Sequence, residues 1–245
     1  MHEIILWVAG NSTVHAKTIL MTWFVMLCLL IFVFICLRKL TSGTPGKMQN
    51  ILEWLVDFVR GMISDNIDYK KGGVLLSYLL SLILFIFFCN LIGLFPNILS
   101  PIFNHIQFAG ISEMFGTGTT LMSPTADINT DFALALITIT LVVFFGLKYK
   151  KLHYFGHFIK PHPAFSLIHV IDFVSKPLTL AFRLFGNIYS GEMLVAVILM
   201  PKSAAALAGI IPLPIWLIFC TFIAVIQSYV FTILTLAYIG QAVED

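Results

Sequence analysis

Residues 165–200 have the sequence FSLIHVIDFVSKPLTLAFRLFGNIYSGEMLVAVILM. This mostly apolar segment is longer than the roughly 20 residues that a helix needs to cross a bilayer core. Four charged residues nevertheless lie within it: Asp172, Lys176, Arg183 and Glu192. An ionised side chain at the bilayer centre costs roughly 2.5–3.5 kcal/mol even on lenient insertion scales. We therefore expect these four side chains to face protein or water.

Polar residues of this segment share one face of the expected helix, which turns by about 100° per residue. The stripe lies within about 40° of Arg183, and its members are Asp172, Lys176, Thr179, Arg183, Asn187 and Ser190. Glu192 lies on the opposite face. Lys176 can pair with Asp172 one turn away. Arg183 cannot lose its charge by deprotonation and has no acid within reach on the stripe. Its counter-charge is therefore expected on another helix or another protein.

The composition of the whole chain points to a membrane protein. Of the 245 residues, 59% are apolar and 11% are charged, whereas a soluble domain has about 45–50% and about 25%. A soluble globular protein is therefore excluded, and the net charge of +2 gives no sign of nucleic-acid binding. The four cysteines show no C-x-x-C spacing, which argues against a zinc site or a disulfide framework. We predict one polytopic all-α domain over 1–245.

Apolar runs divide this domain into about five membrane helices and one surface helix. Spans are predicted at 18–37, 74–95 and 132–147, and two long segments, 165–200 and 204–239, must be tilted, bent or broken. Pro212 and Pro214 mark the turn between the long segments. An amphipathic helix at 45–65 is expected to lie along the membrane interface, and packing on a partner protein is the alternative.

The distribution of Lys and Arg predicts the orientation. Connections 38–73 and 148–164 are rich in these residues, whereas 96–131 contains none. The positive-inside rule places the basic connections in the cytoplasm. Segment 1–17 and loop 96–131 are therefore expected outside, with the C-terminus in the cytoplasm.

Two polar patterns resemble metal sites, but neither is complete. His153 and His157 are four residues apart in a basic loop with no obvious third ligand, so solvated side chains are expected. Asp127, Asn129 and Asp131 alternate as in a calcium loop, yet no glutamate completes it. Helix capping is the simpler interpretation of these three residues. No metal and no cofactor are expected.

Residues 175–192, SKPLTLAFRLFGNIYSGE, resemble the signature of subunit a of the rotary F-type ATP synthase. Three more stretches resemble its bacterial members: GKMQN at 46–50 leading to Glu53 and Trp54, NLIGLFP at 90–96, and SPTAD at 123–127. Gln227 and Tyr238 match the last helix of the family. The resemblance covers nearly the whole chain from about residue 20.

This resemblance implies a subunit without a catalytic site, because the ATP chemistry of the family lies on other subunits. It implies a bacterial plasma (inner) membrane as the location. The expected partners are a rotating ring of c subunits, the b subunits of the peripheral stalk and the lipid bilayer, and no nucleic acid. The last two helices would form a long, strongly tilted hairpin against the ring. The transported ion is H⁺ or Na⁺, because its binding site would lie on the ring.

Residue roles also follow from the resemblance. Arg183 matches the arginine that faces the ion-binding carboxylate of each passing c subunit and separates two half-channels. The outer half-channel would use Asn187, Glu192 and Gln227, with Asn90 and Asp127 near its mouth. Candidates for lining the cytoplasmic half-channel are Asp172, Ser175, Lys176 and Tyr238. The chain departs from some relatives at Cys220, where they carry histidine, and at Gly93, where they carry aspartate.

A stand-alone secondary ion transporter or channel is the alternative function. Such transporters are commonly built from internal repeats. The polar stripe of 172–190 has no counterpart in the first three predicted spans. The sequence therefore favours the stator subunit.

Overall fold

The computed structural model describes residues 6–9, 12–38, 46–68, 72–103, 123–150, 163–199 and 212–244. Apart from one short antiparallel hairpin, β1 (Leu6–Ala9) and β2 (Ser12–His15), these residues are helical or lie in short turns. The prediction of an all-α membrane protein is confirmed, although the N-terminal hairpin was not expected. His153 and His157 lie outside the described residues.

Six α-helices and two 3₁₀ turns make up most of the described chain. Their bounds are α1 (Ala16–Leu37), α2 (Lys47–Asn66), η1 (Gly73–Leu75), α4 (Leu76–Phe103), η2 (Pro124–Ala126), α6 (Ile128–Lys150), α8 (Pro163–Leu199) and α9 (Pro212–Glu244). Four candidate spans are long and apolar enough to cross a membrane: Thr18–Leu37, Gly73–Gly93, Ile128–Lys150 and Pro212–Val243. The charged helix α8 is not among these four, so the fifth crossing stays a prediction.

Some helix boundaries differ from the predicted ones, and two of the helices concerned contain prolines. Helix α4 continues past Pro96 to Phe103, and α6 begins at Ile128, so parts of the expected outer loop 96–131 are helical. Membrane helices tolerate proline where the freed backbone groups find other partners. Pro212 and Pro214 lie in the first turn of α9 rather than in a connection. A missing backbone N–H costs nothing in this turn, because these N–H groups have no partner within the helix.

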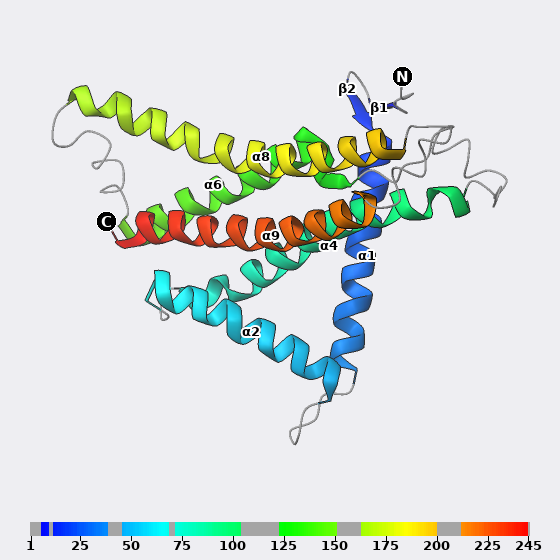
Figure 1. Cartoon of the computed structure of the whole chain (residues 1–245). Helices are drawn as coiled ribbons and strands as arrows, with labels where there is room; N and C mark the ends of the chain where they lie inside the picture. The colour runs from blue at the N-terminus through cyan, green and yellow to red at the C-terminus, as the bar shows by residue number, and fades with distance from the viewer. Residues whose placement is uncertain are drawn as a thin grey trace.

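The long helices α8 and α9 run side by side in opposite directions, at a steep angle to α1 (Figure 1). Helices α4 and α6 pack against this pair. Apolar side chains from all four helices close one core, which consists of Leu82, Ile86, Ala135, Leu180, Ala181, Leu184 and Phe231. This core fixes the side of α8 that faces protein.

Helix α2 is amphipathic, as predicted, but only part of its apolar face packs on the bundle. Val59, Met62 and Ile63 are buried in a second core together with residues of α4, α6 and α9. Ile51 and Trp54 are exposed instead. Exposed apolar side chains suit a helix at the membrane interface, and that location stays a prediction.

Candidate functional site

Arg183 lies on the exposed side of α8. Leu180, Ala181 and Leu184 on the neighbouring side are buried in the core, and they fix the rotation of the helix. The guanidinium group has no ion-pair or hydrogen-bond partner within the described part of the chain. A permanent cation is therefore presented on the surface of a long, mostly apolar helix. A counter-charge for it has to come from outside the described residues.

Glu192 points to the other side of α8, where it meets the turn η2. Its Oε1 accepts a hydrogen bond of 2.9 Å from the backbone N–H of Ser123. Gly93 of α4 leaves the space for this contact, because a Cβ atom at this position would lie 2.9 Å from Glu192 Oε1. The same Cβ would lie 2.5 Å from the Cβ of Ser123. Glycine is therefore required where α4, η2 and α8 meet.

A buried hydrogen-bond network joins η2 to α4 behind Glu192. The Ser123 hydroxyl donates to the carbonyl oxygen of Cys89 at 2.8 Å. The Thr125 hydroxyl donates to Oδ1 of Asn90 at 2.8 Å. Asn90 is only 1% exposed, so it lies inside the bundle. The small polar residues of the SPTAD stretch thus bind α4 through their side chains.

Asp127 connects this region to the first membrane helix. One carboxylate oxygen accepts a hydrogen bond from the backbone N–H of Asn129 at 3.0 Å, which caps α6 as predicted. The other oxygen accepts a hydrogen bond of 2.8 Å from the hydroxyl of Thr18. Asp127 is half-buried. It therefore lies at the edge of the polar region around η2, next to α1.

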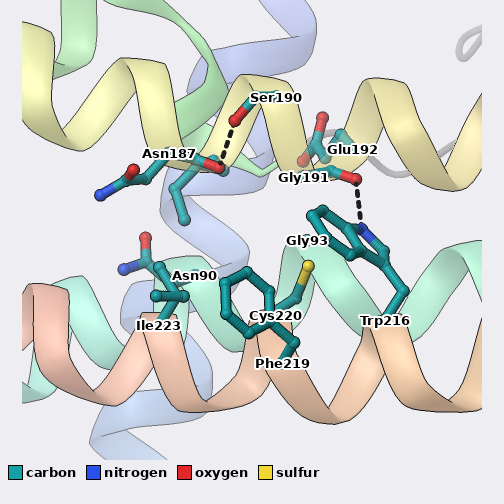
Figure 2. Close-up of a pocket in the computed structure, with 11 residues that line it drawn as sticks. Asn90, Gly93, Asn187, Ser190, Gly191, Glu192, Trp216, Phe219, Cys220 and Ile223 are labelled. Carbon is teal, nitrogen blue, oxygen red and sulfur yellow. Dashed lines mark hydrogen bonds between the residues drawn. The ribbon is translucent and has the colours of Figure 1, made fainter.

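A cavity of about 110 Å³ lies between α4, α8 and α9 (Figure 2). Its lining includes Asn90, Gly93, Asn187, Glu192, Trp216 and Cys220. The Trp216 indole N–H donates to the carbonyl oxygen of Gly191 at 3.3 Å. A cavity of this size with several polar groups can hold water molecules. Glu192 and Asn187 therefore face one shared space.

Asn187 links this space to α9. Its Nδ2 donates to Oε1 of Gln227 at 3.0 Å, and Gln227 is 3% exposed. Asn187 also lies one turn from Arg183 on the polar stripe. Asn187 thus lines the same cavity as Glu192 and also bonds Gln227, and these are the three residues that the resemblance assigned to one half-channel.

A second polar cluster lies nearer the start of α8. Lys176 Nζ is 3.2 Å from Asp172 Oδ2, which confirms the predicted ion pair. The same ammonium group donates to Gln241 Oε1 of α9 at 3.2 Å and lies 5.2 Å from the centroid of the Tyr238 ring. Ser175 takes no part in this cluster, because its hydroxyl donates to Ile171 O in its own helix.

Comparison with known proteins identifies the family to which this chain belongs. The pattern of the family described as ATP synthase A chain matches residues 19–240. The chain belongs to this family. ATP synthase subunit a of Desulforamulus reducens is 36% identical over 96% of this chain and 82% of the relative. Subunit a of Lysinibacillus sphaericus is 34% identical over 100% of this chain and 98% of the relative. That of Gloeobacter violaceus is 34% identical over 98% and 88%.

Membership of the ATP synthase A chain family confirms the resemblance seen in the sequence. Two residues of the site were nevertheless missed. Gln241 was missed because nothing within α9 indicates that it meets Lys176 of another helix. Asp131 was interpreted as a capping residue, which is wrong. Asp127 caps α6, and Asp131 is buried one turn further on, with 0% exposure.

Proposed function

We propose that this chain is the ion-translocating stator subunit of an F-type ATP synthase. Two half-channels would load and unload ions on the carboxylates of a rotating c-ring, and Arg183 would separate them. The observation that carries the proposal is the position of Arg183. Its charge is permanent, exposed on a mostly apolar helix and unpaired within the described residues. A carboxylate supplied by a partner protein would complete the pair.

The physical mechanism follows from the cost of charge in lipid. A ring carboxylate must carry an ion, and so be neutral, while it rotates through the bilayer. Near Arg183 the ionised form is favoured, so the ion leaves. The fixed positive charge also blocks a direct leak of cations between the half-channels. Each ion that crosses delivers about 2.3 kcal/mol per 100 mV as rotation.

Two separate polar regions support two separate half-channels. The outer one would use the cavity beside Glu192, together with Asn187 and Gln227, and Asp127 would lie nearest the outside. The cytoplasmic one would use the cluster around Lys176, with Asp172 and Tyr238. Glu192 and Lys176 are sixteen residues apart on α8, roughly 24 Å at 1.5 Å per residue. Arg183 lies between Glu192 and Lys176 along α8. In this proposal it separates the two polar regions, so ions would not pass directly from one region to the other.

The assembly and orientation belong to the same proposal. The N-terminus would lie outside and the C-terminus in the cytoplasm of a bacterial plasma membrane. The c-ring and the peripheral-stalk b subunits would be the partners, and the ATP chemistry would take place on other subunits. The cargo would be H⁺ or Na⁺, with no cofactor. Membership of the ATP synthase A chain family favours this role over a stand-alone transporter.

Glu192→Gln tests the outer half-channel. The amide keeps the size of the side chain but cannot exchange a proton, so we expect ion-driven ATP synthesis to fall by about 100-fold or more. The measurement is ATP synthesis by the whole complex in liposomes under an imposed ion gradient, at several outside pH values. Glu53→Gln on the exposed side of α2 is the matched control and should leave the rate unchanged. Wild-type rates at all pH values would remove Glu192 from the path.

A further inference from the structure

The carboxyl group of Asp131 is buried without a partner among the described residues. Asp131 lies in the first turn of α6 and is 0% exposed. Neither of its carboxylate oxygens has a hydrogen-bond partner among the described residues. The nearby Asp127, by contrast, uses both of its oxygens. Neither helix capping nor solvation at the surface therefore explains the position of the Asp131 carboxyl group.

The protonation state of Asp131 follows from a comparison of magnitudes. An ionised carboxylate that is buried without a countercharge costs several kcal/mol. The helix dipole stabilises a carboxylate at the N-terminus of α6 by about 0.3–1 kcal/mol, and by about 2 kcal/mol in the best geometries. Asp127 and Cys89 are the described titratable groups close enough to act on Asp131, and neither supplies positive charge. On α8, Arg183 is exposed, and Glu192 is itself an acid. The neutral acid is therefore the stable form.

Polar side chains of η2 and α4 precede Asp131 at the start of α6. Asp131 lies shortly after η2, and its backbone N–H donates to the carbonyl oxygen of Asp127 at 3.4 Å. Side chains of η2 form the network in which Ser123 bonds the Cys89 carbonyl oxygen and Thr125 bonds Asn90. The Nδ2 of Asn90 is buried and has no acceptor among the described residues. Asn90 also lines the cavity that Glu192 faces. Asp127, which follows η2, is half-buried and accepts a hydrogen bond from Thr18 of α1.

We propose that Asp131 holds a proton and is a further proton-exchange residue of the outer half-channel, between Asp127 and the cavity that Glu192 faces. This inference rests on the proposed function and assigns H⁺ as the ion. One O–H bond breaks at Asp131 as its proton passes through hydroxyl groups or water toward Glu192. A new O–H bond forms at Asp131 with a proton delivered from the side of Asp127. No charge accumulates and no other reactant is consumed.

Asp131→Asn in the whole ATP synthase tests this inference. The amide has the size and neutrality of the protonated acid, so the complex should assemble normally. Passive proton conduction through membranes stripped of the catalytic sector should fall by about tenfold, less than for a group that alone transfers the proton. Its dependence on the outside pH should also change shape, which a purely structural role would not produce.

Thr138→Val is the matched control, because Thr138 is equally buried in α6 and valine keeps the size of its side chain. Conduction should stay at the wild-type level in this variant, and an equal loss would mean a packing effect and overturn the inference. Failure of Asp131→Asn to assemble would overturn it too, since a neutral acid tolerates its amide. Unchanged conduction and pH dependence in Asp131→Asn, with a loss in Glu192→Gln, would overturn this inference alone. No loss in either variant would instead count against the proposed function.

Discussion

Replacing Arg183 with alanine is expected to abolish ion-driven ATP synthesis while the complex stays assembled. The side chain is exposed and bonds no described residue, so its loss leaves the cores of the bundle intact. Without the guanidinium charge, the ring carboxylate of the proposed function would no longer be favoured in its ionised form beside α8, and it would keep its ion. The barrier between the half-channels disappears as well, so we expect proton leak through the assembled membrane sector.

ATP synthesis under an imposed ion gradient and passive ion leak measure the two effects of Arg183→Ala separately. Arg60→Ala is the matched control, since Arg60 is an exposed arginine of α2 that pairs with Asp57 at 3.3 Å. An exposed pair of this kind contributes about 0–1 kcal/mol, so the control should behave as the wild type. Normal synthesis by an assembled Arg183→Ala complex would refute the proposed role of Arg183.

Interactions within one helix could be predicted from the sequence. Spacing alone predicted the ion pair of Asp172 and Lys176 and the separation of Glu192 from the stripe of Arg183. These relations depend only on the 3.6-residue period of the helix. The long, mostly apolar segments likewise predicted the class of fold.

Interactions between helices could not be predicted in this way. Periodicity says which face of a helix is polar but not which neighbour that face meets. The bond from Ser123 to Glu192 and the contact of Lys176 with Gln241 both join segments far apart in the sequence. Asp131 is the clearest case, because its alternation with Asp127 and Asn129 was interpreted as helix capping. Its burial depends on how α8 and η2 pack against α6.

Gly93→Ala is expected to damage the outer half-channel as severely as loss of the Glu192 carboxylate. The added Cβ would lie 2.5 Å from Ser123 Cβ and 2.9 Å from Glu192 Oε1, so η2 and the carboxylate must both move. Overpacking of this kind costs about 1–3 kcal/mol. We expect a lower melting temperature of the membrane sector and ion-driven synthesis no faster than in Glu192→Gln.

A double variant separates the two effects of the Gly93 substitution. If Gly93→Ala acts on synthesis by displacing Glu192, then adding Glu192→Gln should slow it little further, because residues in direct contact do not act additively. Gly61→Ala is the control, since a Cβ there meets nothing within 4 Å. In the middle of α2 this change should stabilise by about 0.5–1 kcal/mol. Additive losses in the double variant would show that Gly93 acts on packing alone.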